Sequence, residues 1–114
     1  MNTLSRTFIE AVAQIERKLT PENKSLFHTV YAFQFKDTGE SATLDLHDQT
    51  GRGWLAGSPE QFGLVGDFEV TLSTEDFVKL VAGALHPMAG MATGRMQLKG
   101  NIKEALLLDR LLKS

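Results

Sequence analysis

Cysteine is absent from this 114-residue sequence, and its absence excludes several kinds of site. The chain has no disulfide framework, no thiolate nucleophile and no cysteine-ligated zinc. An excess of charge of one sign is lacking too, because 12 Lys and Arg against 14 Asp and Glu leave a formal net charge of -2. We therefore expect no general attraction to nucleic acid or to anionic lipid headgroups. Histidine, carboxylate and hydroxyl groups remain for any chemistry.

Long hydrophobic runs are also missing. No stretch approaches the roughly 18 consecutive apolar residues of a membrane-spanning helix, so stable insertion into a bilayer is not expected. The first residues have no basic patch before an apolar run, and Glu10 falls where a signal peptide would be most hydrophobic. The C-terminal Leu112-Lys113-Ser114 is not the Ser-Lys-Leu peroxisomal signal. These observations predict a cytoplasmic protein.

The composition that is present suits one folded domain over residues 1–114, because 42% hydrophobic and 23% charged residues can form a core and a hydrated surface. Apolar residues recur at spacings of three and four from Leu4 to Leu19, which predicts an amphipathic helix that ends at Thr20-Pro21. A linker is expected to follow this helix.

Period-two alternation then predicts β-strands. In the first, Phe27, Tyr31, Phe33 and Phe35 share one aromatic face. Turn residues after it, followed by a second alternating segment, predict a hairpin. The expected strands are residues 27–36, 42–47, 54–57, 68–72 and 95–99.

Two further helices are predicted in the second half of the chain. Ser73 is placed to cap a helix whose apolar stripe continues to Leu85 and which Pro87 would end, and the short apolar segment 88–93 fits one further helical turn. Asn101 and Glu104 form a variant of the capping box before a last helix, whose leucines cover more than one of its sides. Another helix, a partner subunit or an apolar ligand must cover the leucines that one face of the sheet cannot bury.

Polar residues give only weak signs of catalysis or metal binding. Asp45, His47 and Asp48 are the best local group, but a metal site needs three or four convergent ligands, so a solvated strand face explains them better. Ser73 lacks a nucleophile elbow, and the glycine pairs Gly51/Gly53 and Gly63/Gly66 lack the context of a nucleotide-binding loop. We expect no enzyme, no metal and no cofactor.

Two features allow a ligand-binding interpretation beside a structural one. Met88, Met91 and Met96 lie close together and could form an adaptable wall, or they could fill gaps in a core. Arg95 and Lys99 share one strand face and could meet an anionic headgroup, or they could be the hydrated side of an edge strand.

Three stretches in the C-terminal half of the sequence, taken in order, resemble the sterol carrier protein 2 family, also called non-specific lipid-transfer domains. They are Phe68 to Phe77 (FEVTLSTEDF), Gly83 to Pro87 (GALHP) and Gly94 to Asn101 (GRMQLKGN). The resemblance covers about residues 67–112 without gaps. It is nearest to free-standing bacterial members of the family.

The resemblance implies an α+β fold in which helices cover one face of a five-stranded, mainly antiparallel sheet. It also implies an apolar tunnel between sheet and helices that takes fatty acyl chains, acyl-CoA, sterols or phospholipids, with no cofactor. Met91, Ala92 and Thr93 stand where many members have bulky apolar residues and a Gln, which bears on the tunnel's width. In family terms the tunnel would be lined by Phe77, Leu80, Val81, Leu85, Met88, Met91, Met96, Leu98, Leu107, Leu108 and Leu111.

Carriage of an apolar ligand without catalysis is the function predicted first. About 0.8 kcal/mol per buried methylene lets ten methylenes supply roughly 8 kcal/mol, which corresponds to micromolar affinity. Arg95, Gln97 and Lys99 would then only orient a headgroup. The alternative is a protein-interaction or homodimerisation module that buries the last helix against a partner enzyme or a second copy.

Overall fold

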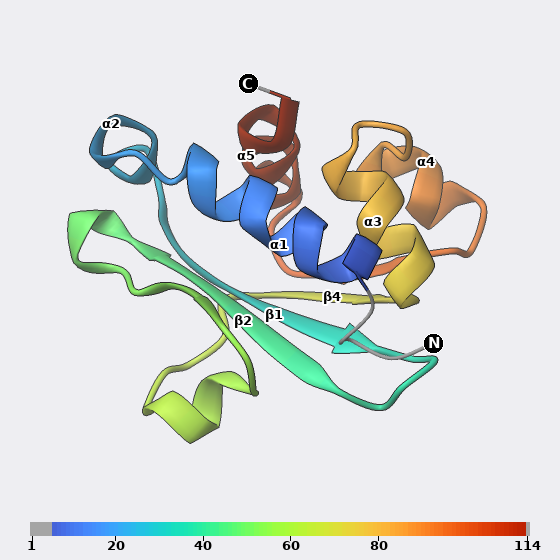
Figure 1. The fold of residues 1–114 in the computed structure, drawn as a ribbon, viewed down its shortest axis with the longest axis horizontal. Coiled ribbons are helices and arrows are strands. Elements are labelled where there is room, and N and C mark those ends of the chain that lie inside the picture. Colours follow the sequence, from blue (N-terminus) through green and yellow to red (C-terminus); the bar gives the residue numbers. More distant parts are fainter. Residues whose placement is uncertain (1–5, 114) are drawn as a thin grey trace.

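The computed structural model describes residues 6–113 of the chain. Its helices lie on one face of a five-stranded sheet with the strand order β3-β2-β1-β4-β5 (Figure 1). Strands β1 and β4 are parallel and the other neighbours are antiparallel, which confirms the predicted α+β class and mainly antiparallel sheet. The elements are α1 (Arg6–Lys18), α2 (Pro21–Lys24), β1 (His28–Phe35), β2 (Ser41–His47), η1 (Asp48–Thr50), β3 (Gly53–Leu55), η2 (Pro59–Phe62), β4 (Phe68–Leu72), α3 (Thr74–Val81), α4 (Pro87–Ala92), β5 (Gln97–Lys99) and α5 (Ile102–Lys113).

The hairpin of β1 and β2 forms the centre of the sheet, with Tyr31 opposite Leu44. The aromatic face predicted for β1 is buried as expected, because α1, α3 and α5 cover it. The opposite face of β2 is buried as well. There the segment after β3, including the turn η2, crosses under the sheet (Figure 1), and the Thr43 hydroxyl donates to the Gly57 carbonyl at 2.8 Å. Most of β2 is therefore buried on both faces, whereas His28 and Gln34 on the second face of β1 are exposed.

The second half of the chain completes the sheet on the other side of β1. Strand β4 lies parallel to β1, and β5 pairs with β4 so that Lys99 stands opposite Glu69. Strands β3 and β5 are consequently the two opposite edges of the sheet. This separation decides which predicted residues can reach a common site.

Helix α3 begins as predicted but ends earlier. The Ser73 hydroxyl accepts a hydrogen bond from the Asp76 backbone N–H at 3.1 Å, which caps the first turn. The helix stops at Val81, and Gly83 follows with φ +79°, a conformation that glycine adopts without strain. Pro87 does not terminate this helix as we expected. It is the first residue of α4, where a missing N–H is harmless.

Two other local predictions need correction. The expected linker after Thr20 contains the single helical turn α2, in which the Thr20 hydroxyl accepts from the Asn23 N–H. At the start of α5, Asn101 accepts from the Lys103 N–H as a cap should, but the carboxylate of Glu104 accepts from the Thr29 hydroxyl of β1. The predicted capping box is thus replaced by a contact between helix and sheet.

Helix α5 is fastened to the sheet by a polar contact and by its leucines. The hydroxyl of Tyr31 donates to the Glu104 carbonyl at 2.6 Å, and burial together with the nearby carboxylate raises the pKa of Tyr31 well above its ordinary value. Leu108, Leu111 and Leu112 are buried, whereas Leu106 keeps 47% of its surface exposed. The fold itself therefore covers most of the surplus leucines.

Candidate functional site

An apolar pocket of about 500 Å³ lies between α1 and the β1–β2–β3 side of the sheet. Helix α1 supplies one wall, the end of β1 and the start of β2 supply the second, and β3 with the two residues after it supplies the third. The lining residues are Phe8, Ile9, Val12, Ala13, Glu16, Phe35, Glu40, Ser41, Ala42, Trp54, Ala56 and Gly57.

The helical wall follows from the amphipathic pattern of α1. Ile9, Val12, Ala13 and Glu16 are spaced by three and four residues and so share one side of the helix. This side is distinct from the one that packs into the core through Ala11 and Ile15. Ile9 keeps 52% of its surface exposed although it is apolar, which fits a wall that is open to solvent.

Aromatic rings close the inner end of the pocket. Phe77 of α3 is fully buried behind it, with its ring centroid 5.1 Å from Phe8, 5.4 Å from Phe35 and 5.3 Å from Trp54. Each of these three neighbours lines the pocket. Phe77 therefore packs against the three aromatic residues of the lining, and it forms with them the apolar inner end of the pocket, which we call the floor.

The rim of the pocket is polar and carries negative charge. Glu16 of α1 and Glu40, just before β2, belong to the lining and are exposed. Ser41 lies beside them, with its hydroxyl donating to the side-chain oxygen of Gln34 at 2.9 Å. Among the described lining residues none is lysine, arginine or histidine. The rim of the apolar pocket is thus lined by exposed acidic side chains and a serine.

The residues predicted for a tunnel do not line this pocket. Phe77 contacts its lining from behind, and Leu80, Val81, Leu85, Met96 and Leu108 belong to the tightly buried core, against which Leu98 and Leu107 pack. Leu107 and Leu111 instead line a smaller apolar pocket of about 130 Å³ between α2 and α5. Met88 is half-buried and Met91 is 40% exposed.

The methionines therefore occupy different environments. Met96 fills a gap in the core, where its side chain presses on Gly90 of α4 and a Cβ at that position would stand 2.5 Å from the sulfur. This contact fits the gap-filling interpretation for Met96. The adaptable wall stays a prediction for Met88 and Met91.

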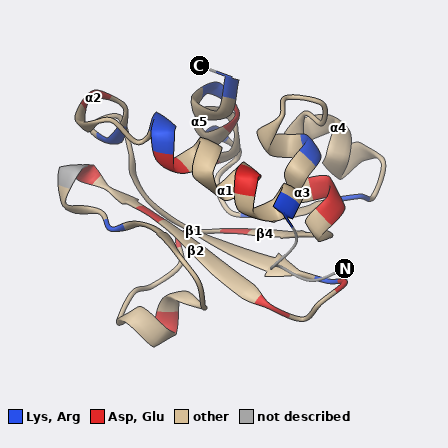
Figure 2. Cartoon of the chain, in the orientation of Figure 1, with Lys and Arg blue, Asp and Glu red and all other residues tan. Residues whose placement is uncertain are grey.

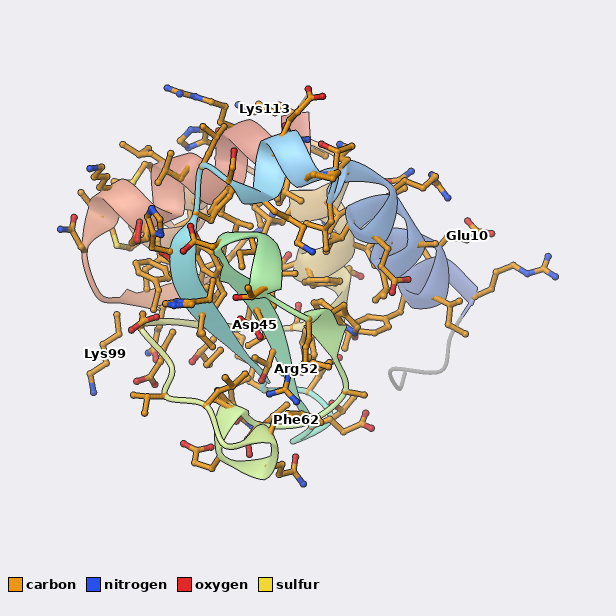
Figure 3. The ribbon with its side chains drawn as sticks, turned by 90° about the vertical axis from the view of Figure 1, so that its left-hand side faces the viewer. Glu10, Asp45, Arg52, Phe62, Lys99 and Lys113 are labelled. Atoms are coloured by element: carbon orange, nitrogen blue, oxygen red, sulfur yellow. The ribbon has the colours of Figure 1, made fainter. Side chains whose placement is uncertain are left out.

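The side chains predicted to hold a headgroup lie far from this pocket in the topology. Arg95, Gln97 and Lys99 are exposed residues in and just before β5, the sheet edge opposite to β3. In Figure 3, Lys99 lies on one side of the molecule and Glu10 of α1 on the other. A headgroup at the mouth of the α1 pocket would meet Glu16 and Glu40 instead of these residues.

The possible acid–base group at the end of β2 has a structural role. Asp45 is only 4% exposed, so it does not belong to a solvated face as we expected. Its carboxylate accepts from the backbone N–H groups of His47 and Arg52 and lies 3.8 Å from the Arg52 guanidinium. Arg52 in turn stacks over Phe62 and donates to its carbonyl (Figure 3). Asp45 thereby fixes the turn between β2 and β3.

Neighbouring histidines do not assemble into a reactive or metal-binding group. His47 is exposed, and Asp48 pairs with His28 at 2.9 Å on the surface. His86 caps α4 through Nδ1 and lies 3.3 Å from Asp109 through Nε2. Within residues 6–113, no three His, Asp or Glu side chains lie where they could jointly hold a metal ion.

Several pocket residues escaped prediction because their types carry no distinctive signal. Ala13, Ala42 and Ala56 leave space because they are small, but alanine is equally common in packed helices and strands. Trp54 is the one aromatic residue of the lining that belongs neither to the strand 27–36 nor to the first helix. Its position in a short strand gave no indication of its partners.

The chain is similar to known proteins over most of its length. The model of the SCP-2 sterol transfer family matches residues 9–113. Hydroxysteroid dehydrogenase-like protein 2 of Rattus norvegicus is 32% identical over 84 residues, and sterol carrier protein 2 of Homo sapiens is 26% identical over 103 residues. These alignments cover 74% and 86% of this chain but only 16% and 18% of the relatives. The resemblance to free-standing bacterial members stays a prediction.

A solved structure shares the fold. Sterol Carrier Protein-2 from Aedes aegypti, solved as a complex with the C16 fatty acid palmitate, superposes with a TM-score of 0.74 over 96% of each chain at 18% identity. No helix in the described part of this chain has the length and apolarity to span a membrane. The family match extends over nearly all of the chain, and the architecture agrees with it. The chain belongs to the SCP-2 sterol transfer family.

Proposed function

We propose that this chain binds and carries an apolar ligand in the pocket between α1 and the β1–β2–β3 side of the sheet. The observation that carries the proposal is an apolar chamber of about 500 Å³, closed by aromatic rings at its inner end and open at a polar rim. Its volume falls in the range of roughly 300–1,000 Å³ typical of small-molecule sites. The Aedes aegypti relative, solved with palmitate, supports a ligand with an acyl chain.

Burial alone supplies sufficient affinity for such a ligand. At about 0.8 kcal/mol per methylene, ten buried methylenes contribute roughly 8 kcal/mol before ordering costs, which is the scale of micromolar binding. Carriage also requires release, and an affinity of this order permits it. No reacting group is needed, so we propose a binding function without catalysis.

We propose that the predicted tunnel is an inward extension of the same pocket. Phe77 contacts the ring of Phe8 in the lining and belongs to the same buried core as Leu80 and Val81, so we infer that a longer ligand would reach these residues once the aromatic rings shift. We propose that the chamber takes the first part of an apolar chain and that repacking around Phe77 sets how much more enters.

The tryptophan of this chain provides a direct test. Trp54 is the only tryptophan, and it lines the pocket, so a brominated lipid bound there quenches the intrinsic fluorescence. We expect saturable quenching by ω-bromododecanol or ω-bromododecanoate. Absence of saturable quenching by both would refute the proposal.

A pair of variants on α1 ties the signal to the pocket. Ala13→Phe places a ring in the lining and should weaken quenching at least tenfold. Glu10→Phe adds the same ring one turn away, at an exposed position outside the lining whose side chain points away from the protein in Figure 3. Equal binding by both variants would show that the ligand sits elsewhere.

A second candidate function rests on exposed apolar residues of α5 and of the segment after α2. Leu26 is 61% exposed, Ile102 is 41% exposed and Leu106 is 47% exposed. We propose as the alternative that this surface contacts a partner protein or a second copy of the chain. A mass that rises with concentration, and falls back in Leu106→Ser, would support it, whereas a monomer at every concentration would refute homodimerisation.

A further inference from the structure

Helix α5 and the segment after α2 expose apolar side chains to solvent. Leu26 is 61% exposed, Ile102 is 41% exposed and Leu106 is 47% exposed. Ile102 and Leu106 are one helical turn apart and so share a side of α5. Leu26 lies beside that helix, because it lines a small pocket together with Leu107 and Arg110. We call Leu26, Ile102 and Leu106, with the cations around them, the α5 surface.

Cationic side chains lie among these apolar residues. Lys103 and Arg110 are exposed and stand before and after Leu106 along α5, and Lys24 of α2 is half-buried. Figure 2 shows Lys and Arg on α2 and towards the C-terminal end of α5. Within residues 6–113, none of these three cations forms an ion pair. No carboxylate of the described residues therefore holds them.

Most carboxylates near the α5 surface are engaged in other contacts. Asp109 is 8% exposed and forms two ion pairs, and Glu104 is half-buried, with its carboxylate accepting a hydrogen bond from β1. Asp48 of η1, next to α2, pairs with His28 at 2.9 Å. Among the described carboxylates of α2 and α5, Glu22 alone is exposed. The described part of this surface thus carries an excess of positive charge.

This charge pattern disfavours a second copy of the chain as the partner. A two-fold symmetric contact places the same surface on both sides, so Lys103 and Arg110 of one copy would approach those of the other. Like charges across a contact oppose association. The pocket between α2 and α5 measures about 130 Å³, close to the size of a cavity that holds one benzene molecule, so it is no groove for a protein segment.

An anionic bilayer complements both the charge and the shape of the α5 surface. Apolar side chains that project beside cations enter the boundary between headgroups and acyl chains, while the cations approach the phosphates. The net charge of -2 gives the whole protein no general attraction to such a bilayer. The attraction is therefore confined to this side of the molecule.

We propose that the α5 surface docks on an anionic bilayer, with Leu26, Ile102 and Leu106 in the interface and Lys103 and Arg110 against lipid phosphates. The contact is peripheral, since no helix of the described residues could span a membrane. None of these five residues lines the pocket beside α1, so the inference is independent of the ligand bound there. Docking brings a lipid carrier to the membrane that supplies its ligand.

Vesicle flotation tests the proposal with defined probes. The protein is mixed with phosphatidylcholine vesicles that contain either no anionic lipid or phosphatidylglycerol at about 30%. Each Lys or Arg near an anionic leaflet strengthens binding about fivefold, so we expect binding to the anionic vesicles to be at least about tenfold tighter. Sodium chloride at about 0.5 M should remove most of this difference, because the Debye length falls to about 4 Å.

Charge-removing variants assign vesicle binding to the α5 surface. Lys103→Gln and Arg110→Gln combined should weaken binding to the anionic vesicles at least about tenfold. Arg6→Gln and Lys36→Gln combined are the matched control, because they remove the same charge at exposed positions where α1 begins and β1 ends, away from α2 (Figure 1). The control should keep its affinity within about twofold.

Apolar variants test the insertion of side chains into the interface. Leu26→Ser and Leu106→Ser combined should weaken binding at least about fivefold, since two apolar side chains no longer leave water. Val65→Ser is the matched control, because Val65 is 81% exposed and lies on the sheet face opposite to the helices. It should bind vesicles as the unmodified chain does. Thermal melting confirms that each variant folds.

The outcomes separate this inference from its alternatives. Equal binding to neutral and anionic vesicles, or equal losses in the surface variants and their controls, would overturn it. Absence of vesicle binding would overturn it as well: a mass that rises with concentration and falls back in Leu106→Ser would then assign the surface to a second copy, and a monomer would indicate an acidic protein. Quenching of Trp54 by a brominated lipid tests the pocket separately, so the proposed function and this inference can fail independently.

Discussion

Phe77→Ala removes the floor of the pocket and should change both stability and ligand preference. The side chain is fully buried and contacts four rings, with centroid distances of 5.1 Å to Phe8, 5.5 Å to Phe33, 5.4 Å to Phe35 and 5.3 Å to Trp54. Phe→Ala in a core costs about 3–5 kcal/mol, and aromatic pairs add to the area term. We expect unfolding free energy to fall by about 4 kcal/mol.

Urea denaturation followed by Trp54 fluorescence measures this loss. A domain of this size has about 5–15 kcal/mol in total, so the variant can be close to the limit of folding. Phe77→Leu is therefore measured beside it, with an expected loss of about 1 kcal/mol. A loss below about 1.5 kcal/mol for Phe77→Ala would refute the packing argument.

The second expected effect of Phe77→Ala is a change in the ligand chain length that binds most tightly. Removing the ring deepens the pocket, so a chain two methylenes longer than the wild-type optimum should gain up to about tenfold in relative affinity. Leu46→Ala is the matched control, because Leu46 is fully buried in the core but neither lines the pocket nor belongs to the predicted tunnel. An unchanged chain-length preference in Phe77→Ala would show that the pocket does not extend inward.

Three further predictions concern polar contacts that stabilise the fold outside the pocket lining. Burial by itself raises the pKa of Asp37, but the hydrogen bonds from the Thr74 hydroxyl and N–H, at 2.6 and 3.0 Å, outweigh it and leave the pKa below its usual value. Its stabilisation is therefore complete above the unfolded-state pKa of about 3.9 and is lost as pH falls through the lower folded value. Because Asp37 is exposed and screened by solvent, Asp37→Asn should cost less than about 1 kcal/mol at pH 7 and little at pH 2, by urea denaturation at both pH values. Tyr31 is the only tyrosine and its pKa is raised by burial, so the folded protein should show no phenolate absorbance at pH 11, and an ordinary titration near pH 10 in the folded state would contradict the contact with Glu104. Asp45→Ala should lose about 2–3 kcal/mol while Trp54 quenching by ω-bromododecanol in the folded fraction stays within twofold, and a large change in binding would contradict a purely structural Asp45.

Local sequence determined where most elements begin and what they bury. The alternation from Phe27 to Phe35 indicated β1, because a half-buried strand has a period of two, and Ser73 indicated the first turn of α3, because its hydroxyl satisfies an orphan N–H. The stretches from Phe68 to Asn101 carried the family resemblance, which the family match confirms. Each of these signals depends only on residues that are close together in the sequence. They can therefore be recognised without knowledge of the tertiary structure.

Only the tertiary structure decided the other features, because these features depend on which elements pack against one another. A proline can end one helix or begin the next. Because the chain turns at Gly83, α3 has already ended before Pro87, and Pro87 begins α4. Asp45 was expected in water but is buried, with its carboxylate accepting from the backbone N–H groups of His47 and Arg52 in the turn between β2 and β3.

The site itself is the clearest case of a feature that only the tertiary structure decided. The predicted tunnel residues all lie in the C-terminal half, between Phe77 and Leu111, and most of them form or pack against the core. The pocket arises where one side of α1 faces β2 and Trp54 of a three-residue edge strand. The sequence by itself determined an apolar interior and the elements that enclose it. A cavity exists only where small side chains from distant segments face one another, and that placement is a property of the assembled fold.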